Sequence, residues 1–568
     1  MTTRLAFLAA ALALAAPAAA QVQGAAERAP GHADPVLRQA AAALADEDLA
    51  TARKELEPEL QRRPDDPLVQ ALGGVLRFHE QRYAEAAELL SRSGVPSGGG
   101  LDYLALAKAA LEITRDHQKA ESEHFRVSYP PGKDEVLVPY LLEALEAQRA
   151  ALQADLGWVP PEKVTIEILT GTRQLARLST LTEEEIRTSG TIALCKFDKL
   201  MIVSPKALAR GYDWLDTAAH EYTHHVVTQR TRNNTPIWLH EGIAKWSESR
   251  WRGAGGDSLS PYAGALLKKA LQRGKLVTFA EMHPSMAKLP SQEAAALAFA
   301  EVMLAVEYLQ KKGGPPLLSR ILERVAGAIP VERAVPEAMG LADFDAFEAE
   351  WRRYLAVRPL PAGGDVALRQ LQFLDDERHK PTAHAEWAEI PDEKARGFAR
   401  LGEIMRERGK WSAARIEYGK AMRRVGPRHG VLTAKYALAA LQSGHEAEAE
   451  AALAEAVKTN PHHPALQVNL GRIKVKKKDW SGAREAFLLA NRIDPFDPEI
   501  HAGLAAAAEA TGDATLAARE QRFARLLLAR PERSPSLGPA AAGVGPHGAR
   551  APGTSPHGGA PAGNPHGK

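Results

Sequence analysis

The stretch that decides the fold is AHEYTH at residues 219–224, followed by WLHEG at residues 238–242. In the first run, His220 and His224 are four residues apart, and residues at that spacing share one face of an α-helix. Two imidazoles can therefore point at one metal ion, which is how the H-E-x-x-H spacing builds a zinc site on a helix. Glu221 lies about 100° further round the helix, beside the metal rather than on it. There its carboxylate can take a proton from a water molecule held by the metal.

The residues around this motif favour a helical site with a third ligand. The flanking segment has an apolar side formed by Leu215, Ala218, Ala219, Val226 and Val227. The run at residues 238–244 predicts the start of a second helix, which would bring in Glu241. Two His and one Glu leave a fourth position open for water, which is the catalytic rather than the structural arrangement. The alternative is a solvated polar helix face whose histidines bind no metal.

The two runs together resemble the gluzincin metallopeptidases, in particular the bacterial peptidase MA-like group, in which a W-L-x-E-G segment follows H-E-x-x-H at a similar distance. The resemblance extends over about residues 122–355. It implies an α+β zincin-like domain with a Zn²⁺ cofactor. The implied metal ligands are His220, His224 and Glu241, the implied general base is Glu221, and the implied substrate is a peptide or protein.

The chain departs from the resembled pattern at two places. A downstream helix of such proteins often begins with an A-Y-A-like pattern, and Phe299 stands where a Tyr is common. If that hydroxyl normally helps to bind an oxyanion, Tyr262 or Tyr308 would have to replace it, and the sequence does not choose between them. Lys245 stands where some gluzincins carry an acidic residue. We expect Glu248, one turn further on, to orient a ligand histidine instead.

A repeat with a period of about 34 residues fills the C-terminal third. A small residue recurs at Ala414, Ala449, Ala483 and Ala517. Turn positions between paired helices are expected at Gly409, Gly444, Lys478 and Gly512. The pattern resembles the tetratricopeptide repeat, with about four units over residues 394–530. One such unit cannot bury its apolar face alone, so the units are expected to stack into a curved solenoid. A purely structural helical bundle is the alternative.

The whole chain is therefore expected to be mainly α, with an α+β zincin-like peptidase domain between two tetratricopeptide α-solenoid segments. The N-terminal segment, residues 34–118, repeats the C-terminal pattern more weakly. The resembled domain is placed at residues 122–358 and a linker at residues 359–393. The tail, residues 531–568, is rich in Pro, Gly and His and is expected to be disordered.

The central segment carries the alternation expected of a small sheet before the metal helix. Strands are predicted at Phe125–Tyr129, Val164–Leu169, 191–194 and 200–203, and a helix at Val136–Leu156. In the resembled proteins an edge strand of the sheet binds extended substrate by β-augmentation. Residues 190–195 are the candidate for that edge, and an interior strand is the alternative.

The start of the chain predicts export. Residues 1–20 have the features of a secretory signal: a positive start at Arg4, an apolar run over residues 5–16, and small residues before a cleavage point at Gln21. We expect a periplasmic or extracellular protein with no stable membrane span after cleavage. An uncleaved anchor is the alternative. Cys195 is the only cysteine, so the chain forms no internal disulfide, and we assign this thiol no nucleophilic role.

Charge and composition narrow the function classes. Lys and Arg together number 72 and Asp and Glu 70, and this near balance argues against nucleic acid as a partner. A peptide or protein substrate and a protein partner of the repeats are the expected partners. The alternatives to a zinc peptidase are a catalytically inactive metal-binding scaffold, which Phe299 slightly favours, and a hydrolase of another bond, such as a cell-wall cross-link amide. Glu221 opposes the scaffold, because a relic has no chemical need for a general base.

Overall fold

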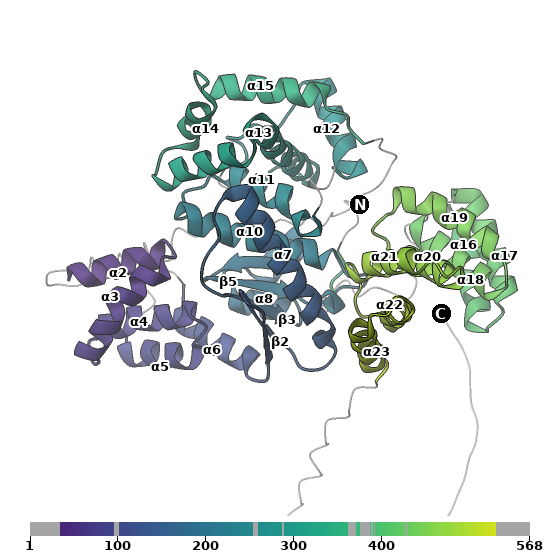
Figure 1. Ribbon diagram of the computed structural model, residues 1–568, viewed down its shortest axis with the longest axis horizontal. Helices are drawn as coiled ribbons and strands as arrows, with labels where there is room; N and C mark the ends of the chain where they lie inside the picture. The colour runs from purple at the N-terminus through teal and green to yellow at the C-terminus, as the bar shows by residue number, and fades with distance from the viewer. Residues whose placement is uncertain are drawn as a thin grey trace, which may run out of the picture. The chain divides into compact units, whose positions relative to one another are not determined.

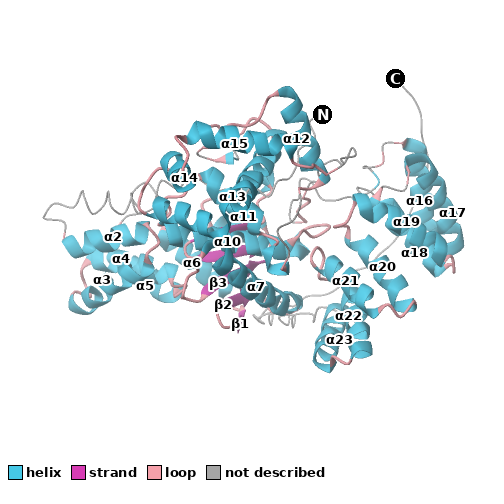
Figure 2. Ribbon diagram, turned by 45° about the horizontal axis from the view of Figure 1, so that its top comes forward, coloured by secondary structure: helices cyan, strands magenta, loops and turns pink. Residues whose placement is uncertain are grey.

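The computed structural model describes residues 34–95, 101–253, 259–283, 285–286, 289–361, 371–374, 387, 390, 392–426 and 429–529. Most of the described chain is helical, and its strands gather in one small sheet (Figure 2). The mainly α fold with an α+β centre is therefore confirmed. The expected signal peptide at residues 1–20, the tail at residues 531–568 and most of the linker at residues 359–393 lie outside the described residues.

The N-terminal segment forms helical hairpins. Its helices are α2 (Pro35–Ala45), α3 (Leu49–Arg62), α4 (Pro67–His79), α5 (Tyr83–Ser93) and α6 (Tyr103–Thr114). Asp34, Asp48, Asp66 and Asp102 each accept a backbone N–H in the first turn of the helix that follows. Such caps satisfy N–H groups that a helix leaves without partners, which is why the hairpins begin where they do. α2 packs on α3, and α4 packs on α5.

The sheet has five strands in the order β1 (Gln118–Glu121), β2 (Phe125–Tyr129), β3 (Val164–Leu169), β5 (Lys199–Val203) and β4 (Ala193–Lys196). The three inner strands are parallel, and β1 and β4 are antiparallel edge strands. The placement of residues 190–195 at an edge is thus confirmed for β4, and the interior alternative is wrong. β1 was not predicted, and it shows that the sheet begins before residue 122.

The helices of the central domain cover this sheet and continue beyond it. They are α7 (Val138–Leu156), α8 (Thr172–Leu178), α9 (Glu183–Ser189), α10 (Trp214–Thr231), α11 (Ile237–Ser247), α12 (Pro261–Arg273), α13 (Gln292–Ala326), α14 (Val331–Met339) and α15 (Phe344–Val357), with short 3₁₀ turns at Lys133–Leu137, Pro205–Ala207 and Arg250–Arg252. α10 packs on β4 and β5 and contacts α7, while α11 lies against α10 and α13 (Figure 1). α13 is interrupted at Gly314, where φ is 61° and two prolines follow, and the buried run before this kink supports the pair α10–α11.

The C-terminal segment forms four helix pairs. They are α16 (Glu393–Glu407) with α17 (Trp411–Val425), α18 (Gly430–Gln442) with α19 (Glu446–Thr459), α20 (Pro464–Lys476) with α21 (Trp480–Asn491), and α22 (Pro498–Thr511) with α23 (Ala514–Leu528). The four recurring alanines are all buried, at 5% exposure or less. The four turn positions have left-handed φ values of 68°, 83°, 59° and 82°, Lys478 among them. Each pair packs on the next along the chain, which confirms a solenoid rather than a bundle.

Candidate metal centre

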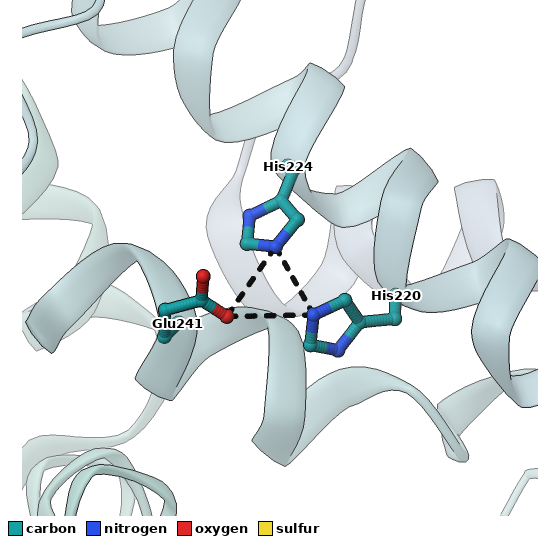
Figure 3. Close-up of side chains that lie close together, drawn as sticks. All are labelled: His220, His224 and Glu241. Atoms are coloured by element: carbon teal, nitrogen blue, oxygen red, sulfur yellow. Dashed lines mark hydrogen bonds and ion pairs between the residues drawn. The ribbon is translucent and has the colours of Figure 1, made fainter. Parts of the chain in front are cut away.

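Two helices bring the predicted ligands together. His220 and His224 lie on α10, and Glu241 lies on α11 (Figure 3). The Nε2 atoms of the two histidines are 3.0 Å apart, and each is 3.5 Å from Glu241 Oε2. All three side chains are buried, at 3% exposure or less. Among the described residues, this is the one group of three such side chains whose donor atoms converge.

The donor set and its spacing fit a zinc ion. With ligands at about 2.0–2.2 Å, a tetrahedral zinc places neighbouring donor atoms roughly 3.3–3.6 Å apart. The observed separations of 3.0 and 3.5 Å are close to that. Glu241 Oε2 is also buried and faces the two imidazole nitrogens at 3.5 Å, so a cation bound between the three atoms would satisfy its charge. Imidazole nitrogen and carboxylate oxygen are both ligands that zinc accepts.

His220 and Glu241 each favour the charged form of the other. Burial opposes a charge on His220, but the hydrogen bonds and charges of Glu241 and Glu248 outweigh burial and raise the pKa of His220 to about 10. Burial likewise opposes ionisation of Glu241, yet the two imidazoles hold the pKa of Glu241 far below its usual range. The pocket therefore favours an ionised carboxylate facing positive charge. A divalent cation would supply that charge in place of the protons.

Glu221 stands beside the ligands and faces the edge strand. It is 1% exposed, and its Oε2 accepts a hydrogen bond of 2.7 Å from the Cys195 N–H of β4. Burial raises the pKa of Glu221, while the nearby imidazoles of His224 and His220 act in the opposite direction. A buried carboxylate whose pKa is raised toward neutrality is suited to accept a proton and release it again.

A second carboxylate orients one of the ligand histidines, as the sequence predicted. Glu248 follows the last residue of α11, and its Oε2 lies 3.2 Å from Nδ1 of His220. Lys245, on the same helix, donates to the other oxygen of Glu248. A carboxylate in this place fixes both the tautomer and the ring orientation of a metal-binding histidine.

The other ligand histidine is held in a way that sequence reasoning missed. The ring of His224 stacks on that of His240, with centroids 4.5 Å apart and planes 10° from parallel. His240 Nε2 in turn lies 3.2 Å from Thr228 Oγ1, so its ring is fixed to α10. The sequence does contain a signal for this contact, because His240 directly precedes Glu241 in the WLHEG run. In the structure its ring faces α10.

Gly242 allows α11 to lie close against α13. A Cβ atom at this position would come 2.7 Å from the carbonyl oxygen of Val302 and 3.0 Å from a methyl group of Val306. The first distance is too short for an alanine to fit without movement of a helix backbone, and the second is tighter than an ordinary van der Waals contact. The glycine next to Glu241 therefore fixes the depth at which that ligand sits.

Of the two tyrosines proposed to replace the hydroxyl at position 299, Tyr308 is engaged elsewhere. It is buried, and its hydroxyl donates to Glu350 of α15. Burial and the charge of Glu293 raise the pKa of Tyr262. Burial and the charge of Glu221 raise the pKa of a third tyrosine, Tyr212, whose hydroxyl donates to the Val203 carbonyl.

The third C-terminal repeat unit, α20 with α21, contacts the start of α10. Arg492 donates to Asp213 across 2.7 Å and to Asp216 across 3.1 Å. The Trp214 indole N–H donates to the Asn491 carbonyl across 2.9 Å. Asp216 lies one turn before His220 on the same helix, so this repeat unit is joined directly to the element that carries two of the ligands.

Comparison with known proteins agrees with this geometry. Residues 145–357 match the Peptidase MA superfamily, and residues 440–507 match the tetratricopeptide repeat. The central domain is a Peptidase MA superfamily domain. No curated protein matches the chain.

Two solved structures, of a zinc metallopeptidase and of a hydrolase, are similar to the chain. The M1 zinc metallopeptidase from Deinococcus radiodurans is 18% identical, with a TM-score of 0.26, over 44% of this chain and 54% of that chain. Native yeast LTA4 hydrolase is 12% identical, with a TM-score of 0.28, over 72% of this chain and 67% of that chain. The chain thus spans about half the length of the Deinococcus enzyme. At these TM-scores, no property of either protein is carried over.

Proposed function

We propose that this protein is a zinc-dependent peptidase whose tetratricopeptide repeats bind a partner or the substrate protein. The observation that carries the proposal is the buried convergence of one donor atom each from His220, His224 and Glu241, with Glu221 beside them. The match of the central domain to the Peptidase MA superfamily supports it.

The proposed reaction gives each residue a separate task. His220, His224 and Glu241 would hold zinc, which when bound supplies Lewis-acid activation of the attacking water and of the scissile carbonyl. Glu221 would accept a proton from that water at a carboxylate oxygen and pass it to the leaving amine nitrogen as the C–N bond breaks. The Cys195 N–H holds the Glu221 carboxylate in place for this transfer.

The outer edge of β4, on the side away from β5, is the proposed substrate platform. Ile192 accepts the Val203 N–H, so alternate residues from position 192 onward face β5. Ala193 and Cys195 therefore direct their backbone groups away from the sheet. An extended peptide pairing with this edge would lie beside Glu221, which already binds the Cys195 N–H.

An exported location remains part of the proposal. It rests on the signal-like residues 1–20, which lie outside the described residues. Within the described part of the chain, no helix combines the length and the apolar character that crossing a membrane requires.

The test is cleavage of a peptide library by the zinc-loaded chain beside its Glu221→Gln variant. We expect cleavage by the wild type, and a loss of roughly 10²- to 10⁴-fold in the variant with its zinc content unchanged. Absence of cleavage by both proteins, with zinc bound, would contradict the proposal and favour a metal-binding scaffold. Two observations favour the scaffold: residue 299 is a phenylalanine without a hydroxyl, and the Tyr308 hydroxyl is already bound to Glu350.

A further inference from the structure

The turn between β4 and β5 has a backbone that one of its two residues, Phe197, disfavours. Phe197 and Asp198 both have left-handed φ values, of 59° and 57°. Two-residue hairpin turns of this kind usually contain Asn, Asp or Gly, and a bulky aromatic residue in the left-handed region is an outlier. Contacts made elsewhere must therefore stabilise the turn.

The N-terminal helices supply the first of these contacts. The side chain of Phe197 is 2% exposed and lies among three rings, which we call the aromatic socket: Phe78, His79 and Tyr103. The centroid distances from Phe197 are 5.2, 5.7 and 6.1 Å respectively. The socket residues belong to α4 and α6, so the burial of this turn residue depends on the N-terminal array.

A buried ion pair fixes the strand that leaves the turn. Lys199 is the first residue of β5 and is fully buried, and its Nζ lies 2.7 Å from Glu167 Oε2 of β3 and 2.7 Å from the Tyr83 hydroxyl of α5. The same tyrosine donates to the other oxygen of Glu167. A buried charge pair is stable only when its remaining hydrogen-bonding capacity is satisfied. Tyr83 supplies part of that capacity from the N-terminal array.

The metal helix completes the set of contacts. Gln229 of α10 donates to Asp198 Oδ1 and to the Glu47 carbonyl, each across 3.0 Å. Glu47 lies in the turn between α2 and α3. One side chain of the helix that carries His220 and His224 therefore joins the β4–β5 turn to the N-terminal array.

From these contacts we infer that the N-terminal helical array, residues 35–114, is a clamp for the edge strand β4. By holding Phe197 in the aromatic socket, it keeps β4 in the register at which the Cys195 N–H meets Glu221. Phe197 is a positioning residue, because it acts on the site through β4 and touches no reacting group. The effect of the clamp on catalysis rests on the proposed function. Its effect on the position of β4 does not.

This inference changes the role of one of the two repeat arrays. The sequence suggested that both arrays offer binding surfaces for other proteins. In the structure, the aromatic socket already holds a turn of the same chain. The aromatic socket is therefore not a binding site for a partner protein.

Hydrogen–deuterium exchange of residues 190–204 tests the clamp in the full-length zinc-loaded chain. Phe197→Ala removes the ring and leaves the disfavoured backbone, so we expect exchange to rise at least tenfold, with the zinc content unchanged. Phe197→Gly also removes the ring but relieves the backbone, so it should restore part of the protection. Tyr418→Ala removes an equally buried ring from the first C-terminal unit and should leave exchange of residues 190–204 unchanged.

Peptide cleavage by the same variants tests the catalytic consequence. In Phe197→Ala we expect kcat/KM to fall roughly 10- to 100-fold, as for other small displacements of reacting groups, with partial recovery in Phe197→Gly. If the folded Phe197→Ala protein exchanges residues 190–204 at the wild-type rate, the clamp inference is overturned. If that variant does not fold, Phe197→Leu carries the same test. If the wild-type chain cleaves no peptide, the proposed function fails while the exchange result still decides the clamp.

Discussion

Nδ1 of His220 lies 3.2 Å from Oε2 of Glu248, which directly follows the helix that carries Glu241. Nε2 of His220 is turned toward the other ligands. A neutral ring in this position carries its proton on Nδ1, and that N–H donates a hydrogen bond to the Glu248 carboxylate. α11 thus provides one ligand and also orients a ligand of α10. The candidate metal centre therefore depends on the packing of α10 against α11.

Glu248→Ala should weaken zinc binding by roughly 10- to 100-fold, as loss of a carboxylate that orients a metal-binding histidine typically does. Competition with a chelator of known affinity measures the change. Lys245→Met is the matched control, since it removes the partner of Glu248 on the same helix but keeps the carboxylate beside His220. Equal zinc affinity in Glu248→Ala and the wild type would show that the contact has no orienting role.

Gly242→Ala should displace Glu241. The added Cβ would lie 2.7 Å from the Val302 carbonyl oxygen, so α11 must move away from α13. We expect weaker zinc binding and a loss of about 1–3 kcal/mol in the free energy of unfolding, as is usual for overpacking. Gly397→Ala is the control, because a Cβ there meets nothing within 4 Å. Unchanged zinc affinity and stability in Gly242→Ala would contradict the close packing.

Stability should fall with rising pH because of Glu301, which is fully buried on α13. Burial raises its pKa to about 8 in the folded chain, against 4.5 for an ordinary Glu. Between these two values the unfolded chain releases a proton that the folded chain retains. The stability is therefore fully present below about pH 4.5 and is lost as the pH rises toward 8.

The Glu301→Gln variant isolates this effect. Its amide oxygen can still accept the Val277 N–H that Glu301 now accepts, and it does not titrate. Relative to the wild type, the variant should gain stability between pH 5 and pH 8 by a few kcal/mol at most. Denaturant unfolding at several pH values measures the difference. A difference that does not depend on pH would show that Glu301 titrates normally.

Arg492→Met should loosen the contact between the third repeat unit and the metal helix. It removes one partner from Asp213, whose side chain is partly exposed, and one from Asp216, which keeps Arg252, so we expect a loss of about 1–3 kcal/mol in the free energy of unfolding. Arg484→Met, at an exposed position of α21, should change the unfolding free energy by no more than about 0.5 kcal/mol. Asp213→Asn should restore part of the lost stability in the Arg492→Met background. Equal stability of the two Arg variants would contradict the docking.

Much of the site was predictable from local spacing. The four-residue interval between His220 and His224 places both rings on one helix face whatever the rest of the fold does. The repeat turns were equally local, and Lys478 was placed by its period alone. The inner strands were predictable because their β-branched residues alternate or run together.

The missed features depend on contacts that local patterns do not encode. β1 is short and largely exposed, so it has no apolar alternation to reveal it. The stack of His240 on His224 needs the crossing of α10 and α11, and the Arg492–Asp213 pair joins residues 279 positions apart. The socket that holds the ring of Phe197 comes from two helices near the start of the chain, more than 90 residues away.

The most direct test of the account is the metal content of the purified protein beside its His220→Ala and Glu241→Ala variants. We predict close to one zinc per wild-type chain and loss of that zinc in both variants, with the helical content unchanged. A wild-type protein without zinc, or zinc that persists in either variant, would contradict the three-ligand centre and the peptidase proposal that depends on it.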